Sequence, residues 1–245
     1  MKPYLLEIKY EFLSLLRTPR FSLPTLCLPV MFYVLFGIMM NRRSSASLLL
    51  LCGYSVFGVL CAALWGIAPS IASDRSLGWL AVKRASPMPR YAYFVSKTVA
   101  GAAFGLLVHL LLTAVAIWAG HIHITLAQWL WFTVALIAAV PMFCAMGFLL
   151  GCLVTPSSAP GIINMIALPM AVCSGLWFPT EMLPPSMRVA GPWLPPYHVS
   201  QIGRTLLGTL EANEIPMHAA AMTAMTVIAI AAAAWAWRRD EPSHG

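Results

Sequence analysis

Residues 98–180 read TVAGAAFGLLVHLLLTAVAIWAGHIHITLAQWLWFTVALIAAVPMFCAMGFLLGCLVTPSSAPGIINMIALPMAVCSGLWFPT and contain no Asp, Glu, Lys or Arg. An α-helix rises ~1.5 Å per residue, so this stretch corresponds to about 125 Å of apolar helix. That length is roughly four times the thickness of a bilayer's hydrocarbon core. A soluble domain of 245 residues could not bury it. The sequence therefore predicts an integral membrane protein.

Two polar breaks, at residues 120–123 and 155–160, divide this stretch into three membrane spans. Three further uncharged stretches outside it are also long enough to cross a bilayer. The strands of membrane β-barrels alternate apolar and polar residues, whereas these stretches are continuously apolar. We therefore expect an all-α fold with six transmembrane helices in one domain covering residues 1–245. The predicted spans are 21–40, 47–72, 93–119, 127–154, 158–178 and 216–237.

Basic residues are distributed unevenly between the segments that connect the spans. Residues 1–20, residues 74–97 and the C-terminal tail together hold 11 of the 15 Lys and Arg residues. The positive-inside rule places these regions in the cytoplasm. Six spans agree with this placement, because an even number returns both termini to one side. The net charge of +7 thus has a topological cause, and no nucleic-acid partner is expected.

Residues 3–17 are predicted to form an amphipathic helix at the cytoplasmic interface. Apolar residues recur there at helical spacing, and most charged residues lie off that stripe. Such a helix places its apolar face at the lipid head-group boundary. It either anchors the chain or presents a surface to a cytoplasmic partner. The stripe consists of Leu5, Ile8, Phe12, Leu15 and Leu16.

The segment 74–92 is the one sizeable cytoplasmic loop that the sequence predicts. It combines basic residues with a short apolar stretch from Leu77 to Val82, and it is broken by Pro87 and Pro89. The basic residues could act as a topology signal alone. A short helix at this position could also dock a cytoplasmic protein, and both interpretations fit the sequence.

The segment 179–212, expected on the extracytoplasmic side, is too apolar for a free loop and too rich in proline for a spanning helix. Its proline pairs predict short re-entrant helices that dip partway into the outer leaflet before the last span. Non-helical backbone at that depth must pack against protein or line a water-filled path. His198 in this segment would either line a gate or satisfy backbone groups.

Enzyme chemistry finds little support in these residues. The sequence has no GxxxxGK[ST] phosphate-binding loop, and the predicted spans contain no carboxylate of the kind that intramembrane catalysts use. His109 lies in mid-span and is expected to be buried and hydrogen-bonded. His121 and His123 lack the Cys or carboxylate ligands that would complete a metal site. We expect no catalytic, cofactor or metal site in this chain.

The order of these features resembles the type-2 ABC-transporter permeases, a family of bacterial export permeases. The resemblance covers nearly the whole chain and includes Asp74-Arg75 with Gly78 after the second span, and the motif Ser-Gly-Leu-Trp-Phe-Pro at 174–179. It implies a multi-pass subunit of the bacterial cytoplasmic membrane with both termini inside. A second permease copy and two copies of a separate ABC ATPase subunit, which would hold ATP and Mg²⁺, are the implied partners. The implied ATPase-coupling residues are Asp74, Arg75, Leu77, Gly78, Trp79 and Leu80.

The cargo is expected to be amphiphilic or apolar, because spans without formal charge would not compensate a strongly ionic molecule. The segment 179–212 would close the path outside, and Tyr54 would face span 158–178 across the dimer axis. Trp65 and other span-end tryptophans are explained by an interfacial belt. A secondary transporter or a non-transporting polytopic membrane protein remains the alternative. Candidate cavity or gate residues are Tyr54, Asn164, Ser174, Trp177, Phe178 and His198.

Overall fold

The computed structural model describes residues 2–40, 44–79, 90–210 and 214–239, and every regular element within these ranges is a helix. The long helices are α2 (Pro19–Phe32) with its π-helical continuation η1 (Tyr33–Met39), α3 (Ser44–Ser76), α5 (Arg90–Trp118), α6 (Leu126–Leu153) and α10 (Ile215–Arg239). The shorter elements are α1 (Lys2–Leu16), α7 (Ala159–Cys173), η2 (Thr180–Met182), α8 (Pro185–Ala190), η3 (Gly191–Trp193) and α9 (Pro195–Leu206).

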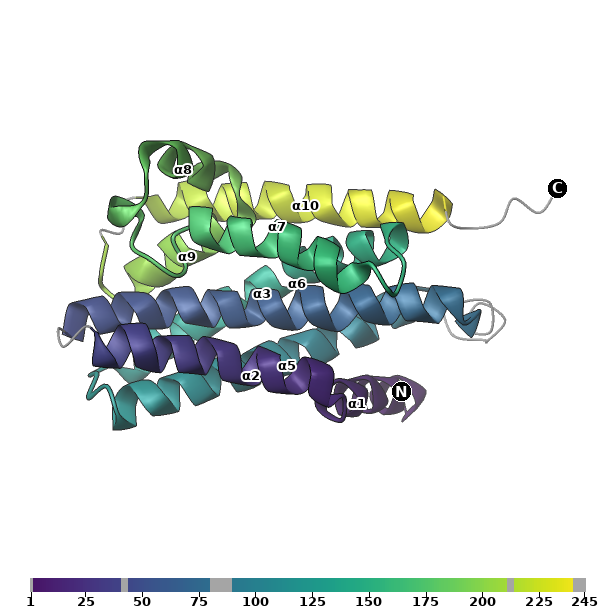
Figure 1. Cartoon of the computed structure of the whole chain (residues 1–245), viewed down its shortest axis with the longest axis horizontal. Helices are drawn as coiled ribbons and strands as arrows, with labels where there is room; N and C mark the ends of the chain where they lie inside the picture. Colours follow the sequence, from purple (N-terminus) through teal and green to yellow (C-terminus); the bar gives the residue numbers. More distant parts are fainter. Residues whose placement is uncertain (1, 41–43, 80–89, 211–213, 240–245) are drawn as a thin grey trace.

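The long helices run side by side as one bundle (Figure 1). Within the described residues, five helices are long and apolar enough to cross a membrane: Pro19–Met39, Ala46–Ser76, Ala92–Trp118, Leu126–Leu153 and Ile215–Arg239. These helices confirm the membrane character of the chain and coincide with five of the predicted spans. The helix α1 and the carboxyl end of α10 lie at the same end of the bundle (Figure 1).

The fifth predicted span, 158–178, is represented by α7, an apolar helix of 15 residues. The helix stops at Cys173, and Gly175 then adopts a left-handed conformation with φ of 73°. A residue with a side chain would be strained there, so the glycine provides a turn that apolar composition does not reveal. The predicted helix was therefore too long at its carboxyl end.

The break between α5 and α6 is defined by turn and cap residues. His121 has a positive φ of 50°, which is uncommon for a residue with a side chain. Thr125 and Gln128 then form a reciprocal capping box. The Thr125 hydroxyl accepts from the backbone N–H of Gln128, and the side-chain oxygen of Gln128 accepts from the backbone N–H of Thr125. This arrangement satisfies N–H groups that a helix start would leave unpaired. The predicted break at 120–123 is confirmed.

Helix α3 forms the centre of the bundle and packs against α2, α5, α6, α7 and α9. Its close approach to α6 depends on small residues. A Cβ atom added to Gly147 would lie 2.8 Å from the Ala63 carbonyl oxygen, and one added to Gly151 would lie 2.9 Å from that of Ala68. The G-x-x-x-G pair of α6 therefore joins two helices of the same chain, as small residues commonly do in membranes.

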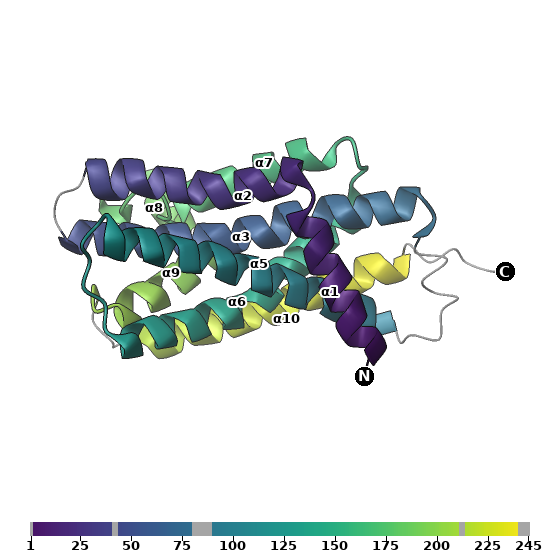
Figure 2. The same cartoon turned by 90° about the horizontal axis from the view of Figure 1, so that it is seen from below.

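Helix α1 crosses the end of the bundle obliquely (Figure 2) and packs against α5 and α2. Phe12 contacts Phe104 of α5 at 6.3 Å between ring centroids, and Leu15 packs against the core. Leu5 and Leu16 are exposed. Phe12 and Leu15 of the predicted apolar stripe therefore pack against protein, where we expected lipid, and Leu5 and Leu16 do not. The reason is that α5 and α2 leave apolar surface uncovered at this end, and α1 covers it.

The segment after α7 forms the short helices η2, α8, η3 and α9, as its proline pairs predicted. Helix α8 is exposed, whereas α9 is largely buried against α3, α6 and α10. The approach of α9 is very close at Gly203, where an added Cβ atom would lie 2.5 Å from the ring of Phe132 and 2.6 Å from the Cys52 sulfur. Helix α9 is therefore an integral part of the bundle.

His109 is buried and hydrogen-bonded, as predicted. Its Nε2 lies 3.2 Å from the Thr133 hydroxyl, which donates its own proton to the Trp129 carbonyl. The Thr133 hydroxyl must therefore accept a hydrogen bond from Nε2–H of His109. In the neutral ring Nδ1 then carries the lone pair, and it accepts a hydrogen bond from the Ser55 hydroxyl at 3.0 Å. Both ring nitrogens have partners, and the residue joins α3, α5 and α6 structurally.

Candidate functional site

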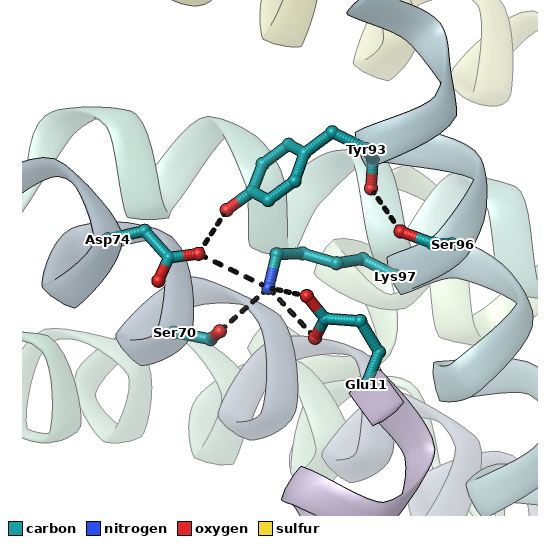
Figure 3. Close-up of polar contacts among 6 residues, drawn as sticks. All are labelled: Glu11, Ser70, Asp74, Tyr93, Ser96 and Lys97. Carbon is teal, nitrogen blue, oxygen red and sulfur yellow. Dashed lines mark hydrogen bonds and ion pairs between the residues drawn. The ribbon is translucent and has the colours of Figure 1, made fainter. Parts of the chain in front are cut away.

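A largely buried cluster of charges joins α1, α3 and α5 (Figure 3). It lies at the end of the bundle that α1 crosses (Figure 2). Its centre is Lys97 of α5, whose side chain is only 3 % exposed. The Lys97 ammonium lies 3.1 Å from each carboxylate oxygen of Glu11 and donates to the Ser70 hydroxyl at 2.8 Å. It also lies 3.6 Å from Asp74 Oδ2. An ammonium has three N–H donors, and the partners from α1 and α3 satisfy them.

Tyr93 completes this arrangement on the Asp74 side. Its hydroxyl donates to Asp74 Oδ2 at 2.6 Å, and its ring lies 4.8 Å from the Lys97 ammonium, within the range of a cation–π contact. Burying a charge is costly unless it is paired and hydrogen-bonded. Here each charge has both kinds of partner. We call Glu11, Ser70, Asp74, Tyr93 and Lys97 the Lys97 cluster.

Arg75, adjacent to the cluster in sequence, ties the same end of α3 to α6. Its Nη1 donates to the Gly151 carbonyl at 3.2 Å and to the Val154 carbonyl at 3.4 Å. Gly151 belongs to the last turn of α6 and Val154 is the C-cap residue that follows it. Carbonyls at a helix end lack intrahelical partners, and a cation is favourable there. The carboxyl end of α3 is therefore held by α1, α5 and α6 together.

The structure divides the sequence-predicted coupling residues into two groups. Asp74 and Arg75 point into the bundle and make the contacts described above. Leu77 and Trp79 lie past the end of α3 and are 68 % and 52 % exposed. Gly78 between them has a φ of 73°, which ends the helix, and Leu80 lies outside the described residues. A helix end that is held by contacts to α1, α5 and α6 thus presents two apolar side chains.

Glu11 and Lys97 were not identified as site residues from the sequence. They are 86 residues apart, and no local pattern connects them. One signal was available. Lys97 is the one charged residue in the predicted span 93–119, and Glu11 is an acidic residue on a helix predicted to be amphipathic. An intramembrane charge normally has a partner.

A groove of about 280 Å³ lies between α2, α3 and α7. Two of the predicted cavity residues, Asn164 and Trp177, line it. Trp65 also lines the groove and donates from Nε1 to Asn164 Oδ1 at 3.1 Å. We had assigned this tryptophan to an interfacial belt, whereas it forms part of the groove wall. The lining has no charged side chain among the described residues. It consists of Pro24, Thr25, Leu28, Phe32, Phe57, Cys61, Trp65, Asn164, Leu168 and Trp177.

Other predicted cavity residues lie behind this groove. Tyr54 is fully buried within the chain, with its ring 6.4 Å from those of Phe32 and Tyr33, and Ser174 is also buried. The expected placement of Tyr54, facing a second copy, is therefore not what the single chain shows. Its large ring is needed to fill the core where α2 and α3 meet. Phe178 is partly exposed and contacts Phe36 at 5.8 Å.

His198 of α9 is buried and bonded through both ring nitrogens. Nε2 lies 2.9 Å from the Pro192 carbonyl oxygen, and Nδ1 lies 2.9 Å from Nδ1 of His218. The bond to Pro192 is the backbone contact that we considered as one possibility. His218 was not identified from the sequence, because it lies in the next helix.

Comparisons with known proteins show the family to which the chain belongs. The sequence profile of the family described as "ABC-2 type transporter" matches residues 4–206, which include the Lys97 cluster, the groove and α9. A protein of Bacillus subtilis (strain 168) named "Putative transport permease YvfS" is 30 % identical over 199 residues, covering 77 % of this chain and 78 % of that protein. This chain belongs to the ABC-2 type transporter family, as a multi-pass membrane permease.

Proposed function

We propose that this chain is the transmembrane permease subunit of an ATP-driven exporter, working as two copies docked to two copies of a separate ABC ATPase. The observation that carries the proposal is the carboxyl end of α3, which is held by contacts to three other helices. The Lys97 cluster and Arg75 fix it to α1, α5 and α6, while Leu77 and Trp79 remain exposed. A docking element needs both properties, because it must transmit a movement and must offer an apolar contact.

In this proposal α7 is the fifth of six spans, with the turn at 174–178 completing its passage across the bilayer. The cytoplasmic side is the end that holds α1, the Lys97 cluster and the carboxyl end of α10. Even parity and the positive-inside rule both support that orientation in a bacterial cytoplasmic membrane. Nucleotide and Mg²⁺ would be bound by the partner ATPase, since these 245 residues contain no phosphate-binding loop.

The orientation predicts which side of the membrane each end of the bundle can be labelled from. A single cysteine in place of exposed Met182, on a background without the natural cysteines, should react with an impermeant maleimide only from outside. A cysteine in place of exposed Arg17 should react only when the cytoplasmic face is opened. Mass-shift labelling of intact cells and inverted vesicles measures both. Labelling of both positions from the same side would contradict the six-span topology.

The docking role predicts that charge at the exposed end of α3 will separate the permease from its ATPase. In the variant with Leu77→Asp and Trp79→Asp, two carboxylates would enter a small apolar contact. We expect co-purification to weaken by about a hundredfold, which corresponds to roughly 2.7 kcal/mol. Quantitative pull-down of the tagged permease with its co-expressed ATPase measures this.

The matched control is Leu126→Asp, another exposed leucine, at the start of α6 and thus at the other end of the bundle. It should leave association with the ATPase unchanged. Equal association of the double variant, the control and the natural chain would show that the exposed end of α3 is a topology signal without a docking role.

The groove between α2, α3 and α7 is proposed as part of the cargo path. Aromatic and aliphatic side chains line it, together with the uncharged polar groups of Thr25 and Asn164. A permanently ionic molecule would lose its hydration there without gaining a countercharge. The groove therefore favours an uncharged amphiphile or the apolar part of a larger one.

A further inference from the structure

A pair of buried histidines ties α9 to the start of α10 at the end of the bundle opposite the Lys97 cluster. The side chains of His198 and His218 are only 6 % and 4 % exposed, and their Nδ1 atoms lie 2.9 Å apart. A contact between two ring nitrogens at this distance requires one to carry a proton and the other to present its lone pair. The protonation states of the two rings are therefore coupled.

The other partners determine which ring donates. His198 Nε2 lies 2.9 Å from the Pro192 carbonyl oxygen, which can only accept, so Nε2 must carry a proton. In the neutral ring, Nδ1 of His198 then presents its lone pair, and His218 donates through its own Nδ1–H. These hydrogen-bond partners assign the tautomers. The chain of bonds links α10 through α9 to η3.

A first additional proton fits this arrangement. His218 Nε2 lies 3.5 Å from a carboxylate oxygen of Glu214, so a proton on Nε2 would form an ion pair and leave the Nδ1–Nδ1 bond intact. The pair then has three N–H groups, each with a partner. Protonating His218 alone therefore leaves the connection between α9 and α10 intact.

A second additional proton does not fit. It could be placed only on Nδ1 of His198, where the lone pair accepts the bond from His218. Two N–H groups would then face each other at 2.9 Å, and two positive charges would be adjacent in a buried site. The contact would have to open, which would remove the hydrogen bond that ties α9 to α10 and leave the two helices held together by packing alone.

Among the described residues, Glu214 is the charged group that faces the pair. Tyr197 packs its ring 5.5 Å and 5.9 Å from the two imidazole centroids. Arg204 lies further along α9, and the Cys52 thiol of α3 is directed at the Ser200 carbonyl. The described residues of α6, α7 and η3 contain no Asp, Glu, Lys, Arg or His.

We propose that His198 and His218 form a proton-operated latch, which fastens the segment 191–206 to α10 at neutral pH and loosens it when both imidazoles are charged. Histidine is the side chain that titrates between about pH 5 and 8. The sign follows from the bonds, since the connection is present at neutral pH and is lost as the pH falls and the second proton binds. In the proposed orientation this segment lies outside, so the latch responds to acidity outside the cytoplasm. The latch itself does not depend on the transport function.

Hydrogen exchange tests this proposal in the full-length chain reconstituted in lipid nanodiscs. Amides in 191–206 are measured by mass spectrometry at pH 7.5 and pH 5, with correction for the intrinsic pH dependence of exchange. We expect exchange in this segment to become roughly tenfold faster in acid, as loss of a buried hydrogen bond predicts. Amides in the middle of α3 should not change.

The decisive variant is His198→Gln, because a glutamine can make the same two contacts without titrating. Its carbonyl can accept from His218 Nδ1–H, and its amide can donate to the Pro192 carbonyl. This variant should remain protected at both pH values, and His123→Gln, a change at an exposed histidine, should respond like the natural chain. His218→Gln should also abolish the response, and it replaces His198→Gln if that variant does not fold. Acid-independent exchange in the natural chain, or a full response in the variant at position 198 or 218, would overturn the proposal.

Discussion

Replacing Lys97 by methionine is expected to destabilise the chain more than any other single substitution at the cytoplasmic end. The change keeps most of the side-chain length but removes the ammonium that pairs with Glu11 and Asp74. Removing one partner of a buried ion pair leaves uncompensated charge and typically costs 3–5 kcal/mol. We expect a loss of about 3 kcal/mol in unfolding free energy, because the two carboxylates are partly exposed. Denaturant titration in detergent micelles measures it.

A double-mutant cycle separates the pairing from the general effect of substitution. Glu11→Gln alone should also destabilise the chain, but the combination with Lys97→Met should cost much less than the two single losses added together. Arg17→Met is the matched control, because this basic residue at the end of α1 is exposed and should change the unfolding free energy by less than about 0.5 kcal/mol. Additive losses in the cycle would show that Glu11 and Lys97 do not act as a pair.

The Lys97 cluster also has an expected functional readout, which rests on the proposed coupling role. If it holds the end of α3 rigidly, Lys97→Met should leave the ATPase bound and lower the ATP hydrolysis that cargo stimulates. The reason is that Leu77 and Trp79 are outside the cluster, while the connection from α3 to α1 and α5 is within it. Unchanged stimulation in a variant that still folds would limit the cluster to a role in stability.

The sequence predicted the positions of the long helices because each is specified by local composition. The predicted span 127–154 and the observed Leu126–Leu153 differ by one residue at each end, and the predicted span 216–237 lies within Ile215–Arg239. An uncharged apolar stretch bounded by charges or caps leaves little freedom in a bilayer. The end of α7 was less predictable, because it depends on the conformation of a single glycine, Gly175.

The site was only partly predictable, because its contacts connect residues far apart in the sequence. The exposed apolar pair at the end of α3 follows from a local pattern. Partners such as Glu11 for Lys97 and His218 for His198 depend on how the helices pack. Tyr54 illustrates the same limit, since a polar group in mid-span was expected to face a cavity and in the single chain is buried among aromatic rings. Composition does not tell which face of a continuously apolar helix is covered.

Filling the groove is expected to weaken cargo binding while leaving the complex assembled. Leu168 lines the groove from α7, and Leu168→Trp would place a larger ring in a space of about 280 Å³. Crowding of this kind costs roughly 1–3 kcal/mol, so affinity for a molecule that uses the groove should fall by about tenfold or more. Met165→Trp is the matched control, because Met165 lies on the same helix, is 80 % exposed and does not line the groove.

A matched pair of dyes tests both the place and the class of ligand. N-phenylnaphthylamine is uncharged, and anilinonaphthalene sulfonate has the same aromatic body with an added anionic group. Titration of the purified permease by the fluorescence of each dye should show tighter binding of the uncharged one, because the groove offers no cation to the sulfonate.

Leu168→Trp should weaken binding of the uncharged dye and Met165→Trp should not. Pull-down of the ATPase should be equal for both variants. Equal binding of the uncharged dye to both tryptophan variants would show that the groove between α2, α3 and α7 is not the place where cargo binds. Preference for the sulfonate would show that an uncharged lining does not select uncharged cargo.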